Sequence, residues 1–566
     1  MTRRSLRELA VVVAGFVVLT AIVLRPLAWN LSTLVYNADN GDGQFSVWNV
    51  AWVARALWTD PLHVLDANIF YPHRWTLTYS ELNLFAGAIG SPAYWLTRNP
   101  YAAANFALIS SFVLSGTGMY YLCREVSGDR RAATVGAIAF AYCPYVFAHL
   151  PHIQLLMTAG LPISLFAFHR LADRPTAGRG AVLGLAMAFQ AYACAYYSLF
   201  VLLLIGFAVL AMAWTRRYWT RTDYWRSVAV GAVTACVLMG PLFVTTLFLQ
   251  QTGFTRTLAA SRQYAADWRA YLASSAWLHA WMLSLLGSWK EVLFPGFTTS
   301  VLGVCVALAW SRSGVRQRES ILLYSSLTLA AVWASFGPDA GLYTLLYHAV
   351  PTFSLLRAPS RFGLVVVFGL AVLTSLTVAW LLERTRRQAV LTGLLVSAAI
   401  AEAQVQVKFD PPLRPHPAYH LLATLPYGPV LELPVYSRLL AFRRSRYMLD
   451  STWHWKPLVD AYSDYIPPDL TQRAPALAGF PSFESLAGMQ RDQVRYTVIH
   501  LETYEPKMRL DLEHRLTEFA PYLRQLHRDE TLLMFEVVRY PAPGGSQDAP
   551  AHSPPPVATP PAAAPR

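Results

Sequence analysis

Long apolar runs with almost no charge recur through residues 9–406, and they constrain the fold of this chain more than any other feature. A run of about 17–23 apolar residues is what a helix needs to cross a hydrocarbon core about 30 Å thick. The first run, 9–29, is too long for the core of a signal peptide and precedes no small-residue cleavage site, so we expect a retained anchor. We predict an all-α polytopic membrane bundle of about eleven spans. The other runs lie near 101–123, 131–148, 153–171, 179–195, 197–215, 227–249, 297–312, 319–336, 361–382 and 388–406.

The arginines between the runs predict the orientation of the bundle, because short cytoplasmic loops are rich in Lys and Arg. With the N-terminus in the cytoplasm, every short basic turn falls on one side. The stretch 82–96 is placed outside, as a helix lying on or dipping into the membrane, because counting it as a span would move the turn at 124–131 outside. We expect a multi-pass membrane protein with a cytoplasmic N-terminus and an extracytoplasmic C-terminal domain. The cytoplasmic arginines are Arg3, Arg4, Arg7, Arg124, Arg130, Arg131, Arg174, Arg179, Arg216, Arg217, Arg221, Arg226, Arg312, Arg316, Arg318, Arg384, Arg386 and Arg387.

Composition excludes several function classes. The net charge of +13 lies mainly in these arginine turns, so it needs no nucleic-acid partner. None of the four lysines follows a glycine, so no phosphate loop for a nucleotide is present. The five cysteines lie in or beside spans without the spacing of a metal site, and we expect them to pack structurally. No carboxylate lies in the middle of a span, and Glu402 sits near a span end.

The chain changes character after the last span. We predict a bundle at 1–406 with a long first outer loop at 30–100, and a small extracytoplasmic α/β domain at 407–540. Strands are expected at 430–433, 496–500 and 532–538, and helices near 468–490 and 508–526. The Pro/Ala-rich tail at 541–566 is expected to be disordered.

Acids, arginines and aromatic residues gather in the segments placed on the outer face. Asp39 and Asp42 follow the first span in the sequence Asn-Ala-Asp-Asn-Gly-Asp-Gly, where the glycines would permit a tight turn. An aromatic helix at 45–58 could then lie along the membrane interface. The arginines of the later outer loops are Arg256, Arg262, Arg269, Arg357 and Arg361, and a short outer turn carries His149, His152 and Gln154.

Four phrases resemble the GT-C superfamily, membrane glycosyltransferases that take sugars from polyprenyl-phosphate carriers. They are Asp39-Asn-Gly-Asp42, Phe294-Pro-Gly-Phe297, Leu356-Arg-Ala-Pro-Ser-Arg-Phe362 and the segment from Trp455 to Tyr465. Oligosaccharyltransferases, protein O-mannosyltransferases and aminoarabinose transferases are relatives, and the phrases look like those of a bacterial branch. The resemblance implies transfer of a sugar to a hydroxyl of a lipid, glycan or protein acceptor, without a nucleotide cofactor. Many relatives carry adjacent acids in the first outer loop, whereas Asp39 and Asp42 are three apart, which argues against a divalent metal.

This chemistry assigns roles to the outer residues, each beside a simpler alternative. Asp42, with Asp39 as substitute or helper, would be the general base, although Asp and Gly also form solvated turns. Arg357 and Arg361, with Arg256 and Arg262 in reserve, would bind phosphate, although arginines at span ends also reach toward lipid headgroups. His152 and Gln154 would contact substrate, or else only cap and pack at the interface.

Three other functions stay open from the sequence. A lipid or sugar transporter or flippase should show inverted repeats and polar residues inside the bundle, and neither is apparent. A polysaccharide polymerase or ligase would use lipid-linked sugars without the acid of the first loop. A scaffold without catalysis remains if the acids are only loop residues.

Reporter fusions test the topology. Fusions after Arg217 and Arg387 should report a cytoplasmic position, and fusions after Asp42, Glu291 and residue 540 an extracytoplasmic one, because the basic turns lie inside. A cytoplasmic signal from the C-terminal domain would contradict the span count.

Overall fold

The computed structural model describes residues 3–310, 314–405 and 407–541 of the 566-residue chain. The predicted cytoplasmic Arg312 and most of the predicted disordered tail, 542–566, lie outside these ranges. The chain divides into two compact units. The bundle unit combines Met1–Asn37 with Glu81–Pro412, and the sheet unit combines Ala38–Ser80 with Leu413–Arg566. Residues 38–80, which the sequence alone grouped with the bundle, thus fold with the C-terminal part of the chain.

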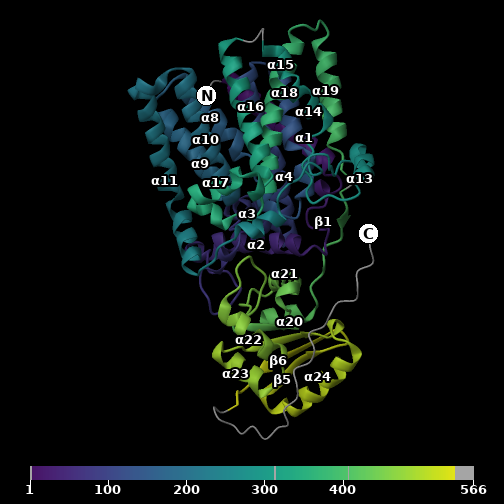
Figure 1. Ribbon diagram of the computed structural model, residues 1–566. Helices are drawn as coiled ribbons and strands as arrows, with labels where there is room; N and C mark the ends of the chain where they lie inside the picture. Colours follow the sequence, from purple (N-terminus) through teal and green to yellow (C-terminus); the bar gives the residue numbers. More distant parts are fainter. Residues whose placement is uncertain (1–2, 311–313, 406, 542–566) are drawn as a thin grey trace. The chain divides into compact units, whose positions relative to one another are not determined.

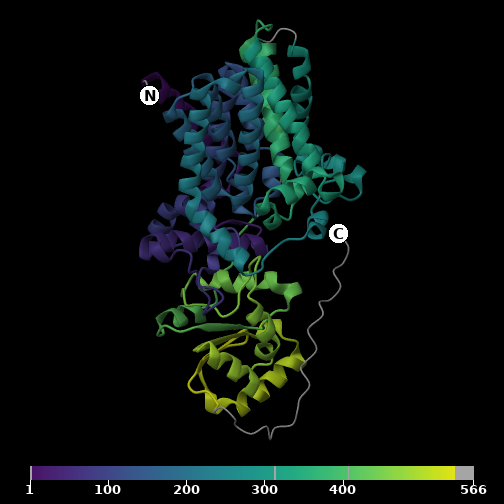
Figure 2. The same cartoon turned by 60° about the vertical axis from the view of Figure 1, so that its left-hand side comes forward.

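Long apolar helices form the bundle unit and run alongside one another (Figures 1 and 2). Seven segments of the described chain are long and apolar enough to cross a membrane, judged by length and composition. This confirms the predicted helical membrane bundle. The segments are α1 (Arg3–Val23), α4 (Pro100–Ser127), α5 (Arg130–Ala141) with α6 (Pro144–Ala148), α7 (Ile153–Leu156) with α8 (Gly160–Asp173), α10 (Ala195–Thr215), α11 (Thr222–Gln251), and the 3-10 helix η9 (Pro359–Phe362) with α18 (Gly363–Leu382).

The other four expected spans are also helical, but they are shorter, broken or more polar. α9 (Ala177–Ala193) has 17 residues and α19 (Gln388–Glu402) has 15. The run at 297–312 divides into α14 (Phe297–Val304) and α15 (Val306–Ala309). α16 (Val315–Ser335) starts with charged residues in its first two turns. The stretch 82–96 forms α3 (Leu84–Thr97), whose 14 residues are fewer than a span needs.

Ion pairs join the helix ends that carry the predicted cytoplasmic arginines. The Glu8 carboxylate of α1 is 3.0 Å from the Arg130 guanidinium at the start of α5. Arg216, just after α10, is 3.0 Å from Asp173 and 2.9 Å from Glu319 of α16. These arginines therefore also tie neighbouring helices together.

Small residues let α9 and α11 pack backbone to backbone. A side chain at Gly180 or Gly184 of α9 would overlap the α11 backbone near Ser227 and Gly231. Apolar helices in lipid gain little from burial alone, so close approach at small residues is a main source of their association.

A carboxylate from a distant segment caps the helix that follows the Phe-Pro-Gly-Phe phrase. Glu402, at the end of α19, accepts hydrogen bonds from the Thr298 N–H at 3.0 Å and from the Thr298 hydroxyl at 2.9 Å. The first N–H groups of a helix have no partner within it, so this contact satisfies a donor in α14. Gly296 has φ +94°, and a Cβ there would overlap the Glu402 carboxylate.

The sheet unit has a four-stranded sheet in the order β3-β4-β6-β5 (Figure 1). β3 (Val430–Leu433) pairs parallel to β4 (Tyr496–His500), and β6 (Leu532–Val537) pairs antiparallel to both β4 and β5 (Leu523–Arg528). Its helices confirm the predicted small α/β domain. They are α2 (Gly41–Thr59), α20 (Ala418–Thr424), α21 (Ser445–Ser451), α22 (Pro468–Ala478), α23 (Phe483–Arg491) and α24 (Pro506–Glu518).

The three predicted strands are present, but one predicted helix is wrong in its second half. The helix expected at 508–526 ends at Glu518, and β5 begins at Leu523. Pro521 lies between the two elements and has no N–H to continue a helix, while β5 pairs antiparallel with β6 from Leu523 to Arg528, with one irregularity between Gln525 and His527.

The predicted aromatic helix at 45–58 is α2, and it is buried along most of its length. Trp48 and Val50 are fully buried, whereas Trp58 at the far end is 65% exposed.

Replacement of Gly296 tests the cap on α14. Gly296→Ala should lower the stability of the protein by about 1–3 kcal/mol, because alanine is strained at this φ and its methyl group overlaps Glu402. The matched control is Gly393→Ala in α19, where an added Cβ has open space and should be neutral or slightly stabilising. Thermal unfolding in detergent measures both, and equal midpoints would contradict this role of Gly296.

Candidate functional site

Two predicted phosphate-binding arginines meet in the bundle unit around one tyrosine. Arg357 precedes the span Pro359–Leu382, and Arg361 lies in its first turn. Tyr196 is the second residue of α10, which starts after the helix break at Cys194. We call Arg357, Arg361, Tyr196, Tyr264 and Glu291 the arginine cluster.

Tyr196 contacts both the backbone and one side chain of the segment 357–361. The N–H groups of Arg357 and Ala358 donate to its hydroxyl oxygen at 2.6 and 2.9 Å. The Arg361 guanidinium lies over its ring, 4.0 Å from the centroid, and that of Arg357 lies 5.1 Å from the centroid of the Tyr264 ring. A cation on an aromatic face gains about 0.5–2 kcal/mol, more where water is excluded.

Arg357 and Arg361 do not share one helical face, although residues four apart would do so if both lay in a helix. The chain is extended at Leu356 and enters η9 only at Pro359, so Arg357 lies before the helix. Pro359 occupies the first turn of η9. The residue before a proline avoids the helical region, which explains the late start.

A half-buried carboxylate accompanies Arg361. Glu291 accepts a hydrogen bond from the Ser360 hydroxyl and lies within electrostatic reach of Arg361 and His152. Burial raises the pKa of Glu291, and the nearby hydroxyl and cation oppose that rise. A developing negative charge beside Arg361 would therefore compete with Glu291 for the guanidinium.

His149 is a neutral neighbour of this cluster. Its Nδ1–H donates a hydrogen bond to the backbone oxygen of Tyr145, 2.8 Å away. Burial lowers the pKa of His149 to about 3, with smaller effects from His152 and Arg361. The ring is thus uncharged at neutral pH, and Nε2 is left as an acceptor.

The remaining predicted ligands are less closely grouped. His152 lies before α7, with its ring centroid 6.3 Å from that of His149, and Gln154 is half-buried within α7. Arg256 lies over the Phe254 ring at 4.7 Å. Arg262 is exposed and pairs with Asp339 at 2.8 Å. An ion pair this exposed contributes little to the stability of the protein.

Asp42, the predicted base, lies in the sheet unit in the first turn of α2. The Asn40 side chain caps this helix by accepting from the Gly43 N–H at 2.9 Å. The Tyr462 hydroxyl donates to Asp42 Oδ1 at 3.1 Å. Asp39 is exposed and lies before the helix.

Gly41, beside Asp42, serves close packing instead of the tight turn that the sequence suggested. Gly41 and Gly43 are helical, and the left-handed residue of this segment is Asn37, at φ +44°. A Cβ on Gly41 would lie 3.0 Å from the Phe442 carbonyl oxygen and 3.2 Å from the Ser445 hydroxyl. Gly41 therefore admits η10 (Arg438–Arg444) and α21 close to the start of α2.

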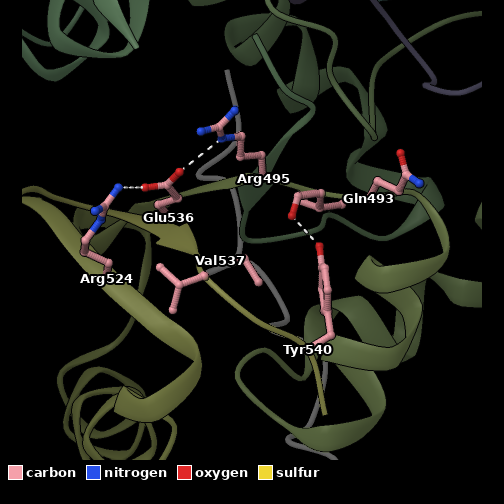
Figure 3. A pocket seen from close by; sticks show the side chains of 8 residues that line it. Gln493, Arg495, Arg524, Glu536, Val537 and Tyr540 are labelled. Atoms are coloured by element: carbon pink, nitrogen blue, oxygen red, sulfur yellow. Dashed lines mark hydrogen bonds and ion pairs between the residues drawn. The ribbon is translucent and has the colours of Figure 1, made fainter. Parts of the chain in front are cut away.

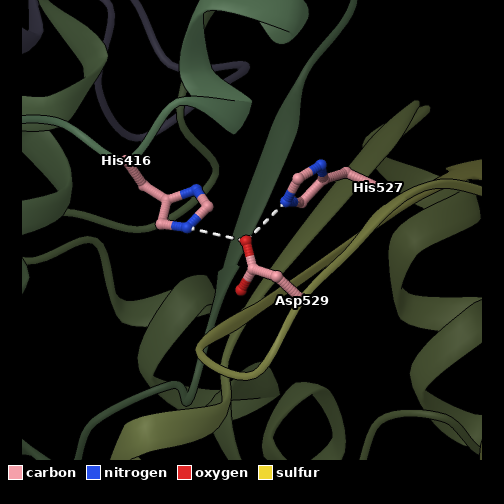
Figure 4. Close-up of side chains that lie close together, drawn as sticks. All are labelled: His416, His527 and Asp529. Atoms are coloured by element: carbon pink, nitrogen blue, oxygen red, sulfur yellow. Dashed lines mark hydrogen bonds and ion pairs between the residues drawn. The ribbon is translucent and has the colours of Figure 1, made fainter.

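One group of side chains has the residue types of a metal site: His416, His527 and Asp529 (Figure 4). Both histidine Nε2 atoms point at Asp529 Oδ2, at 2.9 and 2.7 Å. However, His416 Nδ1 accepts the Ala418 N–H at 3.2 Å, so the proton of the neutral ring lies on Nε2. Asp529 also accepts from the Leu532 N–H at 2.9 Å, so its hydrogen bonds account for the group without a metal ion.

A pocket of about 390 Å³ in the sheet unit lies beside the ends of β4 and β6 (Figure 3). Glu536 at its wall pairs with Arg495 at 3.0 Å and with Arg524. The Tyr540 hydroxyl donates to the Val494 carbonyl oxygen. Both arginines of the wall are thus paired with the same carboxylate.

Sequence reasoning missed three members of the arginine cluster: Tyr196, Tyr264 and Glu291. Tyr196 follows the break between α9, which ends at Ala193, and α10, which begins at Ala195. A polar residue at a helix break in an apolar bundle signals a hydrogen-bonding role, and this signal could have found Tyr196.

No protein-family model and no curated protein matches the chain. Solved structures are similar at 12% sequence identity. The oligosaccharyltransferase of Archaeoglobus fulgidus, in the apo form, has a TM-score of 0.47 over 87% of this chain and 70% of its own. ArnT from Cupriavidus metallidurans bound to undecaprenyl phosphate has a TM-score of 0.49 over 93% of this chain and 97% of its own. The apo state of that ArnT has a TM-score of 0.40 over 94% and 98%.

Oligosaccharyltransferases are one kind of protein that the sequence resemblance names. Similarity at 12% identity and TM-scores below 0.5 assigns no activity to this chain. Its function is therefore argued from its own residues.

Proposed function

We propose that the protein is a membrane glycosyltransferase that moves a sugar from a polyprenyl-phosphate carrier to an acceptor hydroxyl on the extracytoplasmic face. The proposal rests on one observation above all: a half-buried guanidinium, that of Arg361, lies on an aromatic ring in the first turn of an apolar span. A polyprenyl phosphate keeps its tail in lipid and its headgroup at the interface, so its phosphate needs cations where a span meets that interface.

Arginine suits this task because its planar fork can pair with two phosphate oxygens at once. Tyr196 holds Arg361 from one face and holds the backbone of Arg357 through its hydroxyl. Such preorganised donors stabilise the charge that grows on a departing phosphate. Glu291 partly balances Arg361 before substrate binds.

The reaction itself needs few groups. The acceptor oxygen bonds to the anomeric carbon as the bond from that carbon to the phosphate oxygen breaks, and the lipid phosphate leaves with the bonding electron pair. Asp42 takes the acceptor hydroxyl proton, with Asp39 as its substitute. The lipid phosphate is already a good leaving group, so the step calls for no nucleotide cofactor. The acceptor would be a lipid, glycan or protein, and the setting a bacterial inner membrane.

Replacement of Asp42 tests the base. Asp42→Asn keeps the size of the side chain but removes the carboxylate, so turnover should fall roughly 10²–10⁴-fold while expression and unfolding midpoint stay unchanged. Transfer of radiolabelled sugar from a polyprenyl phosphate in liposomes measures this. The control is Asp60→Asn in the same segment, an exposed acid paired with His63, which should keep wild-type turnover. Normal turnover in Asp42→Asn would remove Asp42 from the mechanism and make Asp39→Asn the next variant to measure.

Replacement of the arginines tests the phosphate site. Arg361→Ala and Arg357→Ala should weaken lipid-donor binding roughly 10- to 100-fold, the usual value of charge-assisted hydrogen bonds, and the lysine variants should recover only part. Equilibrium binding of a labelled polyprenyl phosphate in detergent gives the affinities.

The matched control is Arg528→Ala in β5, which should bind the lipid donor like wild type because it only breaks an exposed ion pair with Glu513, 3.1 Å away. Wild-type affinity in both cluster variants would mean that Arg357 and Arg361 only anchor the span. The phosphate site would then have to be sought at Arg256, Arg262 or Arg269.

A further inference from the structure

The C-terminal segment from Trp455 to Tyr465 runs along the segment that carries the candidate base. Within the sheet unit, the Leu458 N–H donates to the Asn68 carbonyl at 3.0 Å, and the Tyr71 N–H donates to the Leu458 carbonyl at 2.9 Å. Farther along, the Tyr465 N–H donates to the Tyr79 carbonyl at 3.0 Å. The two segments thus pair through their backbones at both ends of 458–465.

Side chains reinforce this pairing. The Asn68 amide donates to the Ser451 hydroxyl at 3.1 Å and accepts from the Trp48 indole at 3.1 Å. The Ser445 hydroxyl donates to the Gln44 side-chain oxygen at 3.0 Å. Residues 38–80 are therefore held by the C-terminal part of the chain across most of their length.

Within 455–465, Tyr462 makes a hydrogen bond to a candidate catalytic group. Its hydroxyl donates to Asp42 Oδ1 at 3.1 Å, and its ring meets Phe45 of α2 edge-on, with centroids 5.9 Å apart. Its own N–H donates to Met448 Sδ at 3.3 Å. The ring, the hydroxyl and the backbone of Tyr462 are thus each held.

A buried ion pair fixes the chain just before Tyr462. The Arg444 guanidinium is 2.8 Å from Asp460 Oδ1, with both side chains at most 5% exposed. The same Asp460 oxygen accepts the Ala461 N–H at 2.9 Å. Loss of one partner of such a pair leaves an uncompensated buried charge, so the position of residues 460–462 is strongly determined.

We propose that Tyr462 is a positioning residue for the reaction: its hydroxyl, supplied by the C-terminal domain, orients the Asp42 carboxylate and stabilises its charged form. This rests on the proposed role of Asp42. The C-terminal domain then contributes a side chain to the active site.

Tyr462→Phe removes one oxygen atom and leaves the ring contact with Phe45. We expect kcat to fall about tenfold, the value of one hydrogen bond to a charged group, with KM for the lipid donor unchanged. The matched control is Tyr496→Phe in β4, which loses a hydroxyl bond of 2.9 Å to the Pro426 carbonyl oxygen and should keep wild-type kinetics. Unfolding midpoints of both variants show whether either change acts through stability.

A double-mutant cycle separates positioning from a structural effect. If Tyr462 acts through Asp42, adding Tyr462→Phe to Asp42→Asn should cause no further loss of the residual turnover. A further tenfold loss in that background, or an unchanged kcat in Tyr462→Phe alone, would overturn the inference. Both outcomes differ from failure of the proposed function, in which Asp42→Asn itself would turn over normally.

Discussion

The bundle unit depends on hydrogen-bond partners for the backbone N–H groups at its helix breaks. A helix that starts inside an apolar bundle has first N–H groups without partners, and lipid cannot supply any. In this chain, side chains from distant segments accept hydrogen bonds from these N–H groups. Glu402 accepts from Thr298 at the start of α14, and Glu81 accepts the Ala195 N–H at 2.7 Å at the start of α10. Tyr196 does the same for the Arg357 backbone before η9.

The same constraint prepares the candidate phosphate site. The break between α9 and α10 places Tyr196 where the span Pro359–Leu382 begins, so one side chain satisfies backbone donors and also carries Arg361 on its ring. Tyr196 thus holds the Arg361 cation in a fixed position. A cation that is already in place stabilises a developing negative charge without rearrangement of the site. Asp42, the proposed base, belongs to the sheet unit, which combines residues 38–80 of the first outer loop with the C-terminal part of the chain. Within that unit the Tyr462 hydroxyl donates a hydrogen bond to Asp42.

The sequence predicted what depends on local pattern and missed what depends on distant contacts. Span lengths and strand alternation were enough for the bundle and for β3 and β4, and the arginines at 357 and 361 were correctly placed at the start of a span. The proline between α24 and β5 was the available sign that the helix at 508–526 stops early. No local pattern could show that 38–80 packs with 413–541, that Tyr462 reaches Asp42, or that Gly41 and Gly296 are needed for close approach, because each depends on contacts far apart in the chain.

Transfer by the wild-type protein is the most direct measurement of the central claim. The purified full chain would be placed in liposomes with radiolabelled polyprenyl-phosphate sugars and a pool of lipid, glycan and protein acceptors from bacterial membranes. The proposed function predicts that label moves to an acceptor hydroxyl and that one polyprenyl phosphate is released for each sugar transferred, without added nucleotide. A donor that stays intact with every acceptor while its labelled headgroup crosses the bilayer would contradict it and favour a flippase.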